Sequence, residues 1–505
     1  MFKSIATISG FTFLSRLCGF LRDMLLASFL GAGSLSDAYY VALRLPNLFR
    51  QLFAEGAFNA AFVPLFAGKL ETRGSSEAMT FANRALGALT IALIILTIIA
   101  EIFMPEIMLI MAPGFHKDPQ KYQLAVQLSR IAFPYLVFIS LAALQTGILN
   151  SHRKFAHGAS APIILNIVLI ATLLFIVPHF PQKVGQVLAW ALTGAGVLQM
   201  LWMAMALSRA GIILRMEFAP FATEIKLLMR RMGPGIMTGG INQINLTIAT
   251  ILASFQGNAV SYLYYADRLY QLPLALIGSA IGVALLPNLT RYLRSGRQGD
   301  ADNSFNRAME WGLIFSLPAC FGLMAASYPL INVLYERGAF SGEDSYHTSY
   351  ALIALASGLP AYVANKTLTA GFLAREDTTT PFRGALIAVA TDILVSISLF
   401  PFLGYVGVAL GTSIAAWVNS LLLFYWLRRK NFFQPDEALC RKSWRALLIA
   451  IIMGAGVYFL AREGGNLSGP ILQKLAWLGL IIGTGMGIYA IGLFITRVVS
   501  LKDIR

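Results

Sequence analysis

The long apolar runs of this chain constrain its fold more than any other feature. Residues 85–100, 161–178 and 475–496 approach or reach the roughly 20 apolar residues needed to cross a bilayer. Because hydrocarbon offers no water to pair with peptide groups, each run must satisfy its own backbone hydrogen bonds as a helix. Of all residues, 57% are hydrophobic and 12% charged, against about a quarter charged in soluble domains. We therefore expect an all-α polytopic membrane protein.

Hydropathy, with Gly, Pro and charges as boundaries, predicts about fourteen transmembrane helices. The first 15 residues look like a signal peptide, but Arg16 and Arg22 follow before any convincing cleavage site. We therefore interpret this N-terminal segment as the first membrane span, which is retained. The predicted spans lie near 5–30, 36–67, 79–112, 122–150, 157–178, 185–208, 225–255, 259–290, 304–335, 347–373, 380–400, 403–427, 444–461 and 474–496.

Basic residues are concentrated in every second connection between these spans. The positive-inside rule places these basic connections in the cytoplasm. An even number of spans then places both termini in the cytoplasm. The net charge of +15 is spread over many short loops and does not form the single patch that nucleic acid needs. The rich connections include residues 69–73, 153–154, 209–231, 291–307, 375–383 and 428–445, whereas the opposite set offers little beyond Lys117, Lys121, Lys183, Arg337, Arg462 and Lys474.

The chain contains an internal repeat at a shift of about 225 residues. LASF occurs at 26–29 and again at 252–255, and each copy precedes a YY pair. Three further matches follow in the same order: LPNLFR (45–50) with LPLALI (272–277), VPLFAGKL (63–70) with LPNLTRYL (286–293), and LQTGIL (144–149) with LTAGFL (368–373). Each copy holds six spans, so both enter the membrane in the same direction.

The repeat predicts two six-helix lobes, 1–220 and 221–432, followed by two additional transmembrane helices within 433–505. Parallel repeats of this kind are typical of alternating-access carriers, whose substrate site lies between the lobes near the midplane of the membrane. A purely structural scaffold would not need such a duplication.

Several arginines lie inside predicted spans, where a charge is retained only in a wet or paired environment. Guanidinium groups in a cavity favour a phosphate, which they grip through two oxygens at once. The alternative is that the arginines snorkel to the interface or brace helices through salt bridges. The substrate-binding set that we predict is Arg16, Arg22, Arg50 and Arg268.

Acidic residues near these arginines indicate which charges are neutralised within a helix. The seven-residue spacing places Arg16 on one face with Asp23, and Asp37 on one face with Arg44. Arg22 and Arg50 have no acidic residue three or four positions away, and Asp267 directly precedes Arg268. These spacings predict the pairs Arg16–Asp23 and Asp37–Arg44 and leave Arg22 and Arg50 for a ligand.

Other chemistry is sparse, and we expect a carrier with no enzymatic activity, no cofactor and no bound metal. The five histidines and three cysteines lack metal-ligand spacing, and neither a nucleophile elbow nor a P-loop occurs. Asp392 is a lone carboxylate inside a span and is either a coupling-cation ligand or a satisfied structural residue. The other candidate cation ligands are Asn242, Asn245 and Thr412.

Four segments carry a resemblance to a known family: SRLCGFLRD at 15–23, the stretch 31–64, YYADRLYQLP at 264–273 with the LLPNL after it, and LYERGAFS at 334–341. The chain closely resembles the MurJ (MviN) family of bacterial lipid II flippases, within the multidrug, oligosaccharidyl-lipid and polysaccharide exporter superfamily. The resemblance covers essentially the whole chain, including the fourteen spans.

The resemblance implies transport of undecaprenyl-pyrophosphate-linked peptidoglycan precursor to the periplasmic leaflet of the bacterial inner membrane by a monomer. Its functional arginines match Arg16, Arg22, Arg50 and Arg268, and its functional polar positions match Asp37 and Ser261, to which we add Asp267. It implies lipid II, membrane lipids and cell-wall synthesis proteins as partners, and a polyprenyl tail guided by the two C-terminal helices. Relatives often carry an acid where this chain has Gln271.

Two other transport functions stay open on the sequence. A flippase for another polyprenyl-pyrophosphate oligosaccharide would need the same cationic cavity. A drug or cation antiporter is less compatible, because arginines repel cations. A coupling ion or the membrane potential would drive any of the three.

Overall fold

The computed structural model describes residues 2–51, 56, 58–219, 222–463 and 469–499, and its elements there are helical. Packing divides the chain into two compact units, Met1–Ser261 and Tyr262–Arg505. The predicted boundary after residue 220 depends on the sequence repeat, not on packing, and it stays a prediction.

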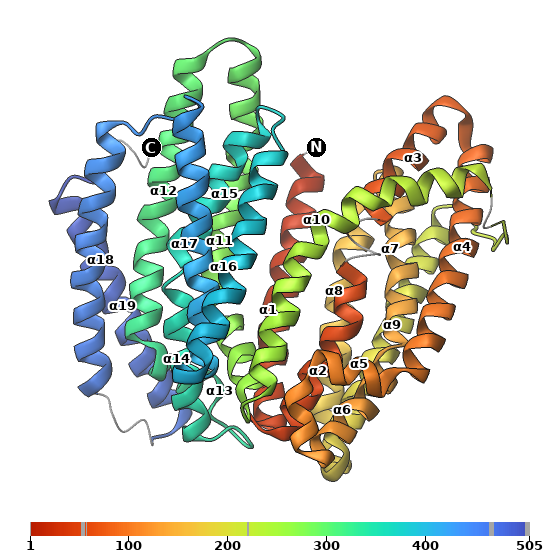
Figure 1. The fold of residues 1–505 in the computed structure, drawn as a ribbon, viewed down its shortest axis with the longest axis horizontal. Coiled ribbons are helices and arrows are strands. Elements are labelled where there is room, and N and C mark those ends of the chain that lie inside the picture. The colour runs from red at the N-terminus through yellow and green to blue at the C-terminus, as the bar shows by residue number, and fades with distance from the viewer. Residues whose placement is uncertain (1, 52–55, 57, 220–221, 464–468, 500–505) are drawn as a thin grey trace. The chain divides into compact units, whose positions relative to one another are not determined.

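The first unit is built from helices α1 to α10, coloured red to yellow-green in Figure 1. Short 3-10 turns, η2 (Pro113–Lys117), η4 (Val177–His179) and η5 (Pro181–Lys183), and a π-helical turn, η3 (Thr172–Ile176), lie between them. The helices are α1 (Phe2–Leu30), α2 (Ser34–Phe49), α3 (Asn59–Thr72), α4 (Gly74–Ile102), α5 (Met104–Met111), α6 (Pro119–Ala132), α7 (Tyr135–Ser151), α8 (Phe155–Ala171), α9 (Val184–Arg209) and α10 (Thr223–Ser254).

The second unit begins within α11 and continues to the C-terminal helices, coloured green to blue in Figure 1. Its helices are α11 (Ala259–Arg294), α12 (Gln298–Ala325), α13 (Ser327–Tyr335), α14 (Gly342–Ala356), α15 (Leu359–Leu373), α16 (Thr379–Leu403), α17 (Tyr405–Arg429), α18 (Glu437–Glu463) and α19 (Ile471–Ile495).

Each of the fourteen predicted spans falls on one of these helices or on two consecutive ones. The all-α polytopic fold is thereby confirmed. Five spans cover two consecutive helices each, and the pairs are α2 with α3, α4 with α5, α6 with α7, α12 with α13, and α14 with α15.

Proline explains several of these divisions. Pro134 lies between α6 and α7, while Pro105 and Pro360 occupy the first turns of α5 and α15. A proline lacks the N–H that a continuous helix needs and clashes with the preceding turn, but it fits a first turn well. The chain therefore restarts a helix at each of these positions.

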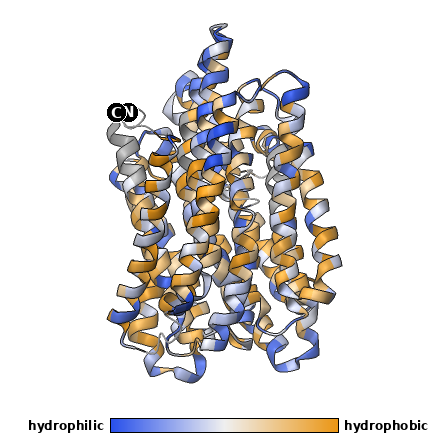
Figure 2. Ribbon diagram, turned by 90° about the vertical axis from the view of Figure 1, so that its left-hand side faces the viewer, coloured by the Kyte–Doolittle hydropathy of each residue, from blue (hydrophilic) through white to orange (hydrophobic). Residues whose placement is uncertain are grey.

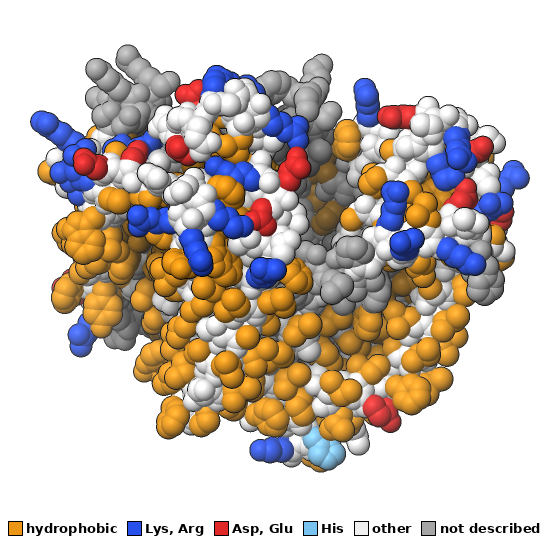
Figure 3. Space-filling view, turned by 45° about the horizontal axis from the view of Figure 1, so that its top comes forward, with side chains coloured by type: hydrophobic (Ala, Val, Ile, Leu, Met, Phe, Trp, Pro, Cys, Tyr) orange, Lys and Arg blue, Asp and Glu red, His pale blue; other side chains and the backbone are white. Residues whose placement is uncertain are grey.

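The surface is that of a membrane protein. Nine described helices are long and apolar enough to cross a bilayer. Figure 2 shows hydrophobic residues (orange) through the middle of the helices and hydrophilic residues (blue) toward their ends. In each unit, Lys and Arg side chains gather over one set of helix ends above a hydrophobic belt (Figure 3). Large apolar side chains such as Phe175, Ile452 and Met486 are exposed, as expected where lipid and not water is the solvent.

The two C-terminal helices pack on α12 within the second unit. Ile314, Ile449 and Ile481 lie in one buried cluster drawn from α12, α18 and α19. Glu310 on α12 is 2% exposed and accepts a 2.7 Å hydrogen bond from Lys442 on α18. Arg307 bridges Glu310 to Asp436. A buried charged pair and an apolar seam thus hold the extra helices to this unit.

Candidate functional site

Asp37 forms a completely buried polar site in the first unit. It lies in the first turn of α2 with 0% of its surface exposed. Its Oδ2 accepts a 2.6 Å hydrogen bond from the Lys121 ammonium of α6, and its Oδ1 accepts a 2.8 Å bond from the backbone N–H of Ser261 and another from the Ser261 hydroxyl. The Ser36 and Ser261 hydroxyl oxygens are 2.9 Å apart. Asp37 therefore fastens the start of α11 to the start of α2.

The partner of Asp37 differs from the one that the sequence predicted. The expected Asp37–Arg44 pair is wrong, because Lys121, 84 positions later in the chain, occupies the carboxylate. Arg44 donates a 3.0 Å hydrogen bond to the Leu246 carbonyl of α10 and another to the Thr250 hydroxyl. A contact made by distant parts of the chain leaves no trace in local spacing, and Lys121 was assigned only to a loop.

Arg22 is held by neighbours in the first unit. Its guanidinium donates hydrogen bonds of 2.8 and 3.1 Å to the adjacent Asp23, and another of 2.9 Å to the Asn166 side chain on α8. Asn166 in turn donates to the Ser15 carbonyl of α1. The expected Arg16–Asp23 pair is therefore wrong, because Arg22 occupies the Asp23 carboxylate. Arg22 connects α1 to α8, and its role as a phosphate ligand stays a prediction.

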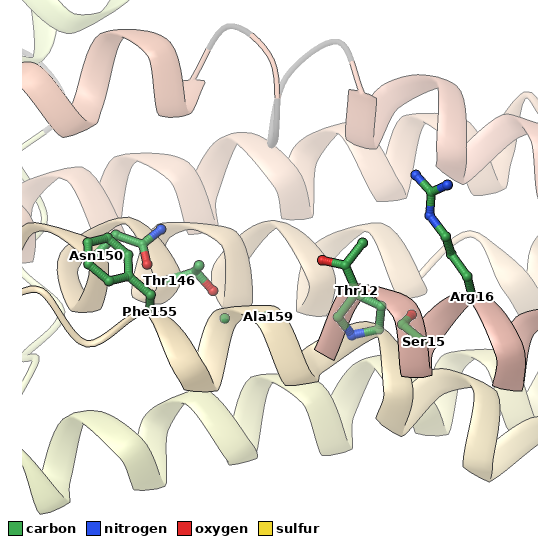
Figure 4. Close-up of a pocket in the computed structure, with 9 residues that line it drawn as sticks. Thr12, Ser15, Arg16, Thr146, Asn150, Phe155 and Ala159 are labelled. Carbon is green, nitrogen blue, oxygen red and sulfur yellow. The ribbon is translucent and has the colours of Figure 1, made fainter. Parts of the chain in front are cut away.

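Arg16 lies in a different environment on the same helix. Its side chain is exposed and has no ion-pair partner among the residues that the structure describes. It borders a cavity of about 390 Å³ between α1, α7 and α8, shown in Figure 4. Polar groups of Thr12, Ser15, Thr146 and Asn150 share that lining. A cation with unused donors at the mouth of a cavity is suited to bind an anion.

Arg50 ends α2 and is partly buried. Its Nε donates a 3.2 Å hydrogen bond to the side chain of Asn47 one turn earlier. The residues that follow it, 52–55 and 57, lie outside the described part of the chain. Pro46 interrupts the hydrogen-bond ladder of the same helix. The role of Arg50 as a phosphate ligand stays a prediction.

Arg268 and Asp267 lie next to each other on α11 in the second unit. The Arg268 guanidinium lies 4.6 Å from the centre of the Tyr264 ring, a cation–π contact that fixes its side chain. Gln271 donates a hydrogen bond to the Asp267 carboxylate one turn away. An acid at this position would repel Asp267, whereas the amide satisfies it. Gln271 thus gives Asp267 a neutral donor.

Lys366 is a cation in a predicted span that the sequence reasoning missed. Lys366 lies on α15, in the predicted span 347–373, and its side chain is exposed. It makes no hydrogen bond or ion pair with any described residue. Its Cγ would be 3.6 Å from a Cβ placed on Gly278 of α11, so its apolar stem lies along a glycine. The signal was present in LPAYVANKTLTAGFL, where a lone lysine interrupts an apolar run.

The candidate coupling-cation residues are divided between the units. Asp392 on α16 is 4% exposed and accepts a 2.9 Å hydrogen bond from Ser396. The Thr412 hydroxyl of α17 donates a 3.2 Å hydrogen bond to the Val408 carbonyl. Asn245 belongs to α10 in the first unit, and the side chain of Asn242 lies outside the described residues. Within the described residues, no group of three His, Cys, Asp or Glu side chains forms a metal site. A joint cation site stays a prediction.

Comparison with known proteins places this chain in a family. The family model described as lipid II flippase MurJ matches residues 26–466. A probable lipid II flippase MurJ from Rhizobium tropici is 41% identical over 510 residues, covering 100% of this chain and 96% of the relative.

Two solved structures share the fold. A lipid II flippase MurJ in an inward closed conformation matches 99% of both chains at 27% identity with a TM-score of 0.82. An inward-facing multidrug resistance MATE transporter of the MOP superfamily matches 82% of this chain and 94% of its own, with a TM-score of 0.70 at 16% identity, a likeness of fold alone. The family model, together with the sequence identity and the coverage of the relative, shows that this chain belongs to the lipid II flippase MurJ family.

Proposed function

We propose that this chain is a lipid II flippase, which moves undecaprenyl-pyrophosphate-linked peptidoglycan precursor from the cytoplasmic to the periplasmic leaflet and so serves cell-wall biogenesis and cell shape. It acts as a carrier, not an enzyme. Membership of the MurJ family supports the substrate. The observation that carries the mechanism is that two cations in predicted spans, Arg16 and Lys366, have no acidic partner among the described residues.

The charges explain why a pyrophosphate is the group recognised. Arg16 and Lys366 each lie within a predicted membrane span and lack an acidic partner among the described residues. A cation exposed to hydrocarbon costs about 2.5–3.5 kcal/mol on insertion scales, so both must face a wet cavity. An anion with several oxygens neutralises such cations, whereas a cationic drug would be repelled. Arg22, Arg50 and Arg268 complete the proposed phosphate-binding set.

The Asp37 site supplies a gate for alternating access. Asp37 binds Ser261 through two hydrogen bonds at the first turn of α11. Because a carboxylate and a hydroxyl exchange partners with water at modest cost, these bonds can break and re-form as the two proposed lobes rock about the substrate. We assign Asp37 and Ser261 to the periplasmic gate, and Asp267 to the positioning of Arg268.

The membrane setting follows from family and charge. We propose the bacterial inner membrane, both termini in the cytoplasm, a monomer as the working unit, and a polyprenyl tail that stays in lipid beside α18 and α19. Lipid II and membrane lipids are the proposed partners, with cell-wall synthesis proteins as further contacts. Asp392 is the proposed site of a coupling cation, with the membrane potential as the other energy source.

Depletion and rescue test the function directly. In bacteria depleted of their own flippase, lipid II should accumulate and become inaccessible to a periplasmic probe, and this chain should restore access and growth. Arg16→Ala should fail to rescue at normal abundance. Arg73→Ala is the matched control, because Arg73 is 61% exposed and its only ion pair among the described residues is with Glu77, four positions later in the first turn of α4. Accumulation of a different polyprenyl-linked oligosaccharide, with lipid II unchanged, would contradict the proposal.

A further inference from the structure

The cavity beside Arg16 has the shape of a ligand site. It is an open cavity lined by α1, α7 and α8 of the first unit, and its volume of about 390 Å³ lies within the range of small-molecule pockets, about 300–1,000 Å³. In Figure 4, Arg16 lies at one end, Asn150 and Phe155 at the other, and Thr12, Ser15 and Thr146 between them. The cavity thus has a charged end and a neutral, polar end.

From Ser15 to its neutral end, the cavity carries hydrogen-bonding groups that the described residues leave wholly or partly unused. The Asn150 side-chain amide and the Ser15 hydroxyl make no hydrogen bond to any described residue. The Thr146 hydroxyl is a donor to the Ala142 carbonyl one turn earlier and lies 3.5 Å from the Met203 sulfur, and its oxygen keeps a lone pair for another donor. Polar groups left open inside a membrane protein are costly unless water or a ligand satisfies them.

A close helix contact shapes the wall of the cavity. A Cβ on Gly158 of α8 would lie 2.5 Å from the Thr146 methyl group of α7. The glycine lets the two helices approach without filling the space beside Thr146. The Phe155 ring, one turn earlier on α8, supplies an apolar face at the same end. Hydroxyls, an amide and an aromatic face together are the chemistry that recognises a sugar ring.

The cavity also lies on the side from which the proposed substrate comes. Asn150 and Phe155 flank the connection that carries Arg153 and Lys154, which the positive-inside rule assigns to the cytoplasm. Thr12 precedes Arg16 by four residues, about 6 Å along the helix toward the same end. A ligand with its phosphate on Arg16 would therefore extend its next group toward the cytoplasmic end of the cavity.

We propose that this cavity is a saccharide subsite, in which Asn150, Ser15 and Thr146 bind the sugar attached to the pyrophosphate and Phe155 packs against its ring. The inference deepens the proposed flippase function and depends on it. The cavity selects for a glycosylated lipid pyrophosphate over the bare one, because only the sugar satisfies its open polar groups. Arg16 serves both ligands, since both carry the phosphate.

Two probes separate this subsite from the phosphate site. Purified protein is titrated with lipid II and with undecaprenyl pyrophosphate, which lacks the saccharide. Asn150→Leu should weaken lipid II binding about tenfold, the scale of one or two lost hydrogen bonds, and change undecaprenyl pyrophosphate binding less than about twofold. Thr146→Val should likewise weaken lipid II binding more than undecaprenyl pyrophosphate binding. Arg16→Ala should weaken both probes.

Matched variants control for folding. Thr97→Val removes a hydroxyl that donates to the Leu93 carbonyl as Thr146 does to Ala142, but on α4 and outside the cavity. Ser151→Ala removes the hydroxyl next to Asn150, which donates to the Gly147 carbonyl. Both should bind both probes normally. Ala159→Phe, which fills the cavity, gives a second route should Asn150→Leu lower the melting temperature.

The outcomes are distinct. Equal loss of both probes in Asn150→Leu and Ala159→Phe, or no loss of either, would overturn the subsite. Wild-type protein that binds undecaprenyl pyrophosphate as tightly as lipid II would also overturn it and leave the flippase proposal intact. Wild-type protein that binds neither probe would instead overturn the proposed function.

Discussion

The Lys121 ammonium donates a 2.6 Å hydrogen bond to Asp37, and the two side chains are 6% and 0% exposed. Lys121 also lies 4.3 Å from the centre of the Phe115 ring. Gly114, next to Phe115, donates its N–H to Ser254 at the end of α10. The pair therefore joins α2 and α6 at the place where the end of α10 and the start of α11 also meet them.

Asp37→Ala should destabilise the protein, because it leaves the Lys121 ammonium buried without its carboxylate. Breaking such a pair costs about 3–5 kcal/mol. The double variant Asp37→Asn with Lys121→Met should recover most of the thermal stability, measured by unfolding in detergent. Lys117→Met, which alters an exposed lysine four residues earlier, is the control. An unchanged melting temperature in Asp37→Ala would show that the pair contributes nothing.

Cross-linking tests the gate at Ser36 and Ser261. Their hydroxyl oxygens are 2.9 Å apart, so cysteines at both positions should form a disulfide on mild oxidation. The three natural cysteines, Cys18, Cys320 and Cys440, are replaced first. Transport should stop on oxidation and return with reductant, because rocking requires these residues to separate. Full transport by completely cross-linked protein would contradict gating at this contact.

Hydropathy predicted which segments would become helices, because the requirement for backbone hydrogen bonds in lipid acts on each segment alone. The same property says little about where a helix stops and restarts. Pro105, Pro134 and Pro360 each lie where one helix ends and the next begins, and these prolines are visible in the sequence. The division between α12 and α13 at Ala326 follows the same rule, because Pro329 lies in the first turn of α13.

The charged partners could be predicted only in part, since pairing depends on packing. A seven-residue spacing places two side chains on one face but about 10 Å apart along the axis, too far for the Asp37–Arg44 pair. Lys121 and Asn166 come from helices that no local pattern connects to Asp37 or Arg22. Lys366, by contrast, was visible as a charge inside an apolar run and could have been predicted.

Two lysines in the second unit should respond oppositely to the same substitution. Lys442→Met removes the partner of Glu310, which is 2% exposed, so stability should fall. Lys366 has no acidic partner among the described residues, so Lys366→Met should keep the melting temperature but lower transport at least about tenfold if its ammonium binds phosphate. Abundance, unfolding and flipping are measured side by side. Normal flipping by Lys366→Met would remove this residue from the proposed site.

Topology is tested by cysteine labelling from each side of the membrane. The basic connections 69–77 and 291–303 should react only from the cytoplasm, and 113–120 and 338–346 only from the periplasm. Single cysteines are placed at exposed positions, such as Arg73 and Arg297 for the first set and Lys117 for the second. Reaction of both sets from one side would overturn the predicted orientation and the parallel repeat with it.

The arginines divide into two classes with different expected variants. Arg22 pairs with Asp23, whose side chain is 4% exposed, so Arg22→Ala should lower thermal stability, and adding Asp23→Asn should restore it. Arg16 has no such pair, so Arg16→Ala should keep its stability and lose binding of a lipid pyrophosphate. Arg16→Lys should rescue poorly, because an ammonium keeps the charge but lacks the planar fork that contacts two phosphate oxygens.

The decisive measurement combines the remaining predicted phosphate ligands. A variant with Arg22, Arg50 and Arg268 all replaced by Ala, in an Asp23→Asn background that leaves no orphaned acid at Arg22, should fold but bind lipid II at least about a hundredfold more weakly, since three charge-assisted contacts are lost. The Asp23→Asn variant alone is the control and should bind normally. If these arginines only connect helices, their replacement should change thermal stability and not the affinity for lipid II. Normal lipid II binding by the combined variant would therefore contradict the anion site.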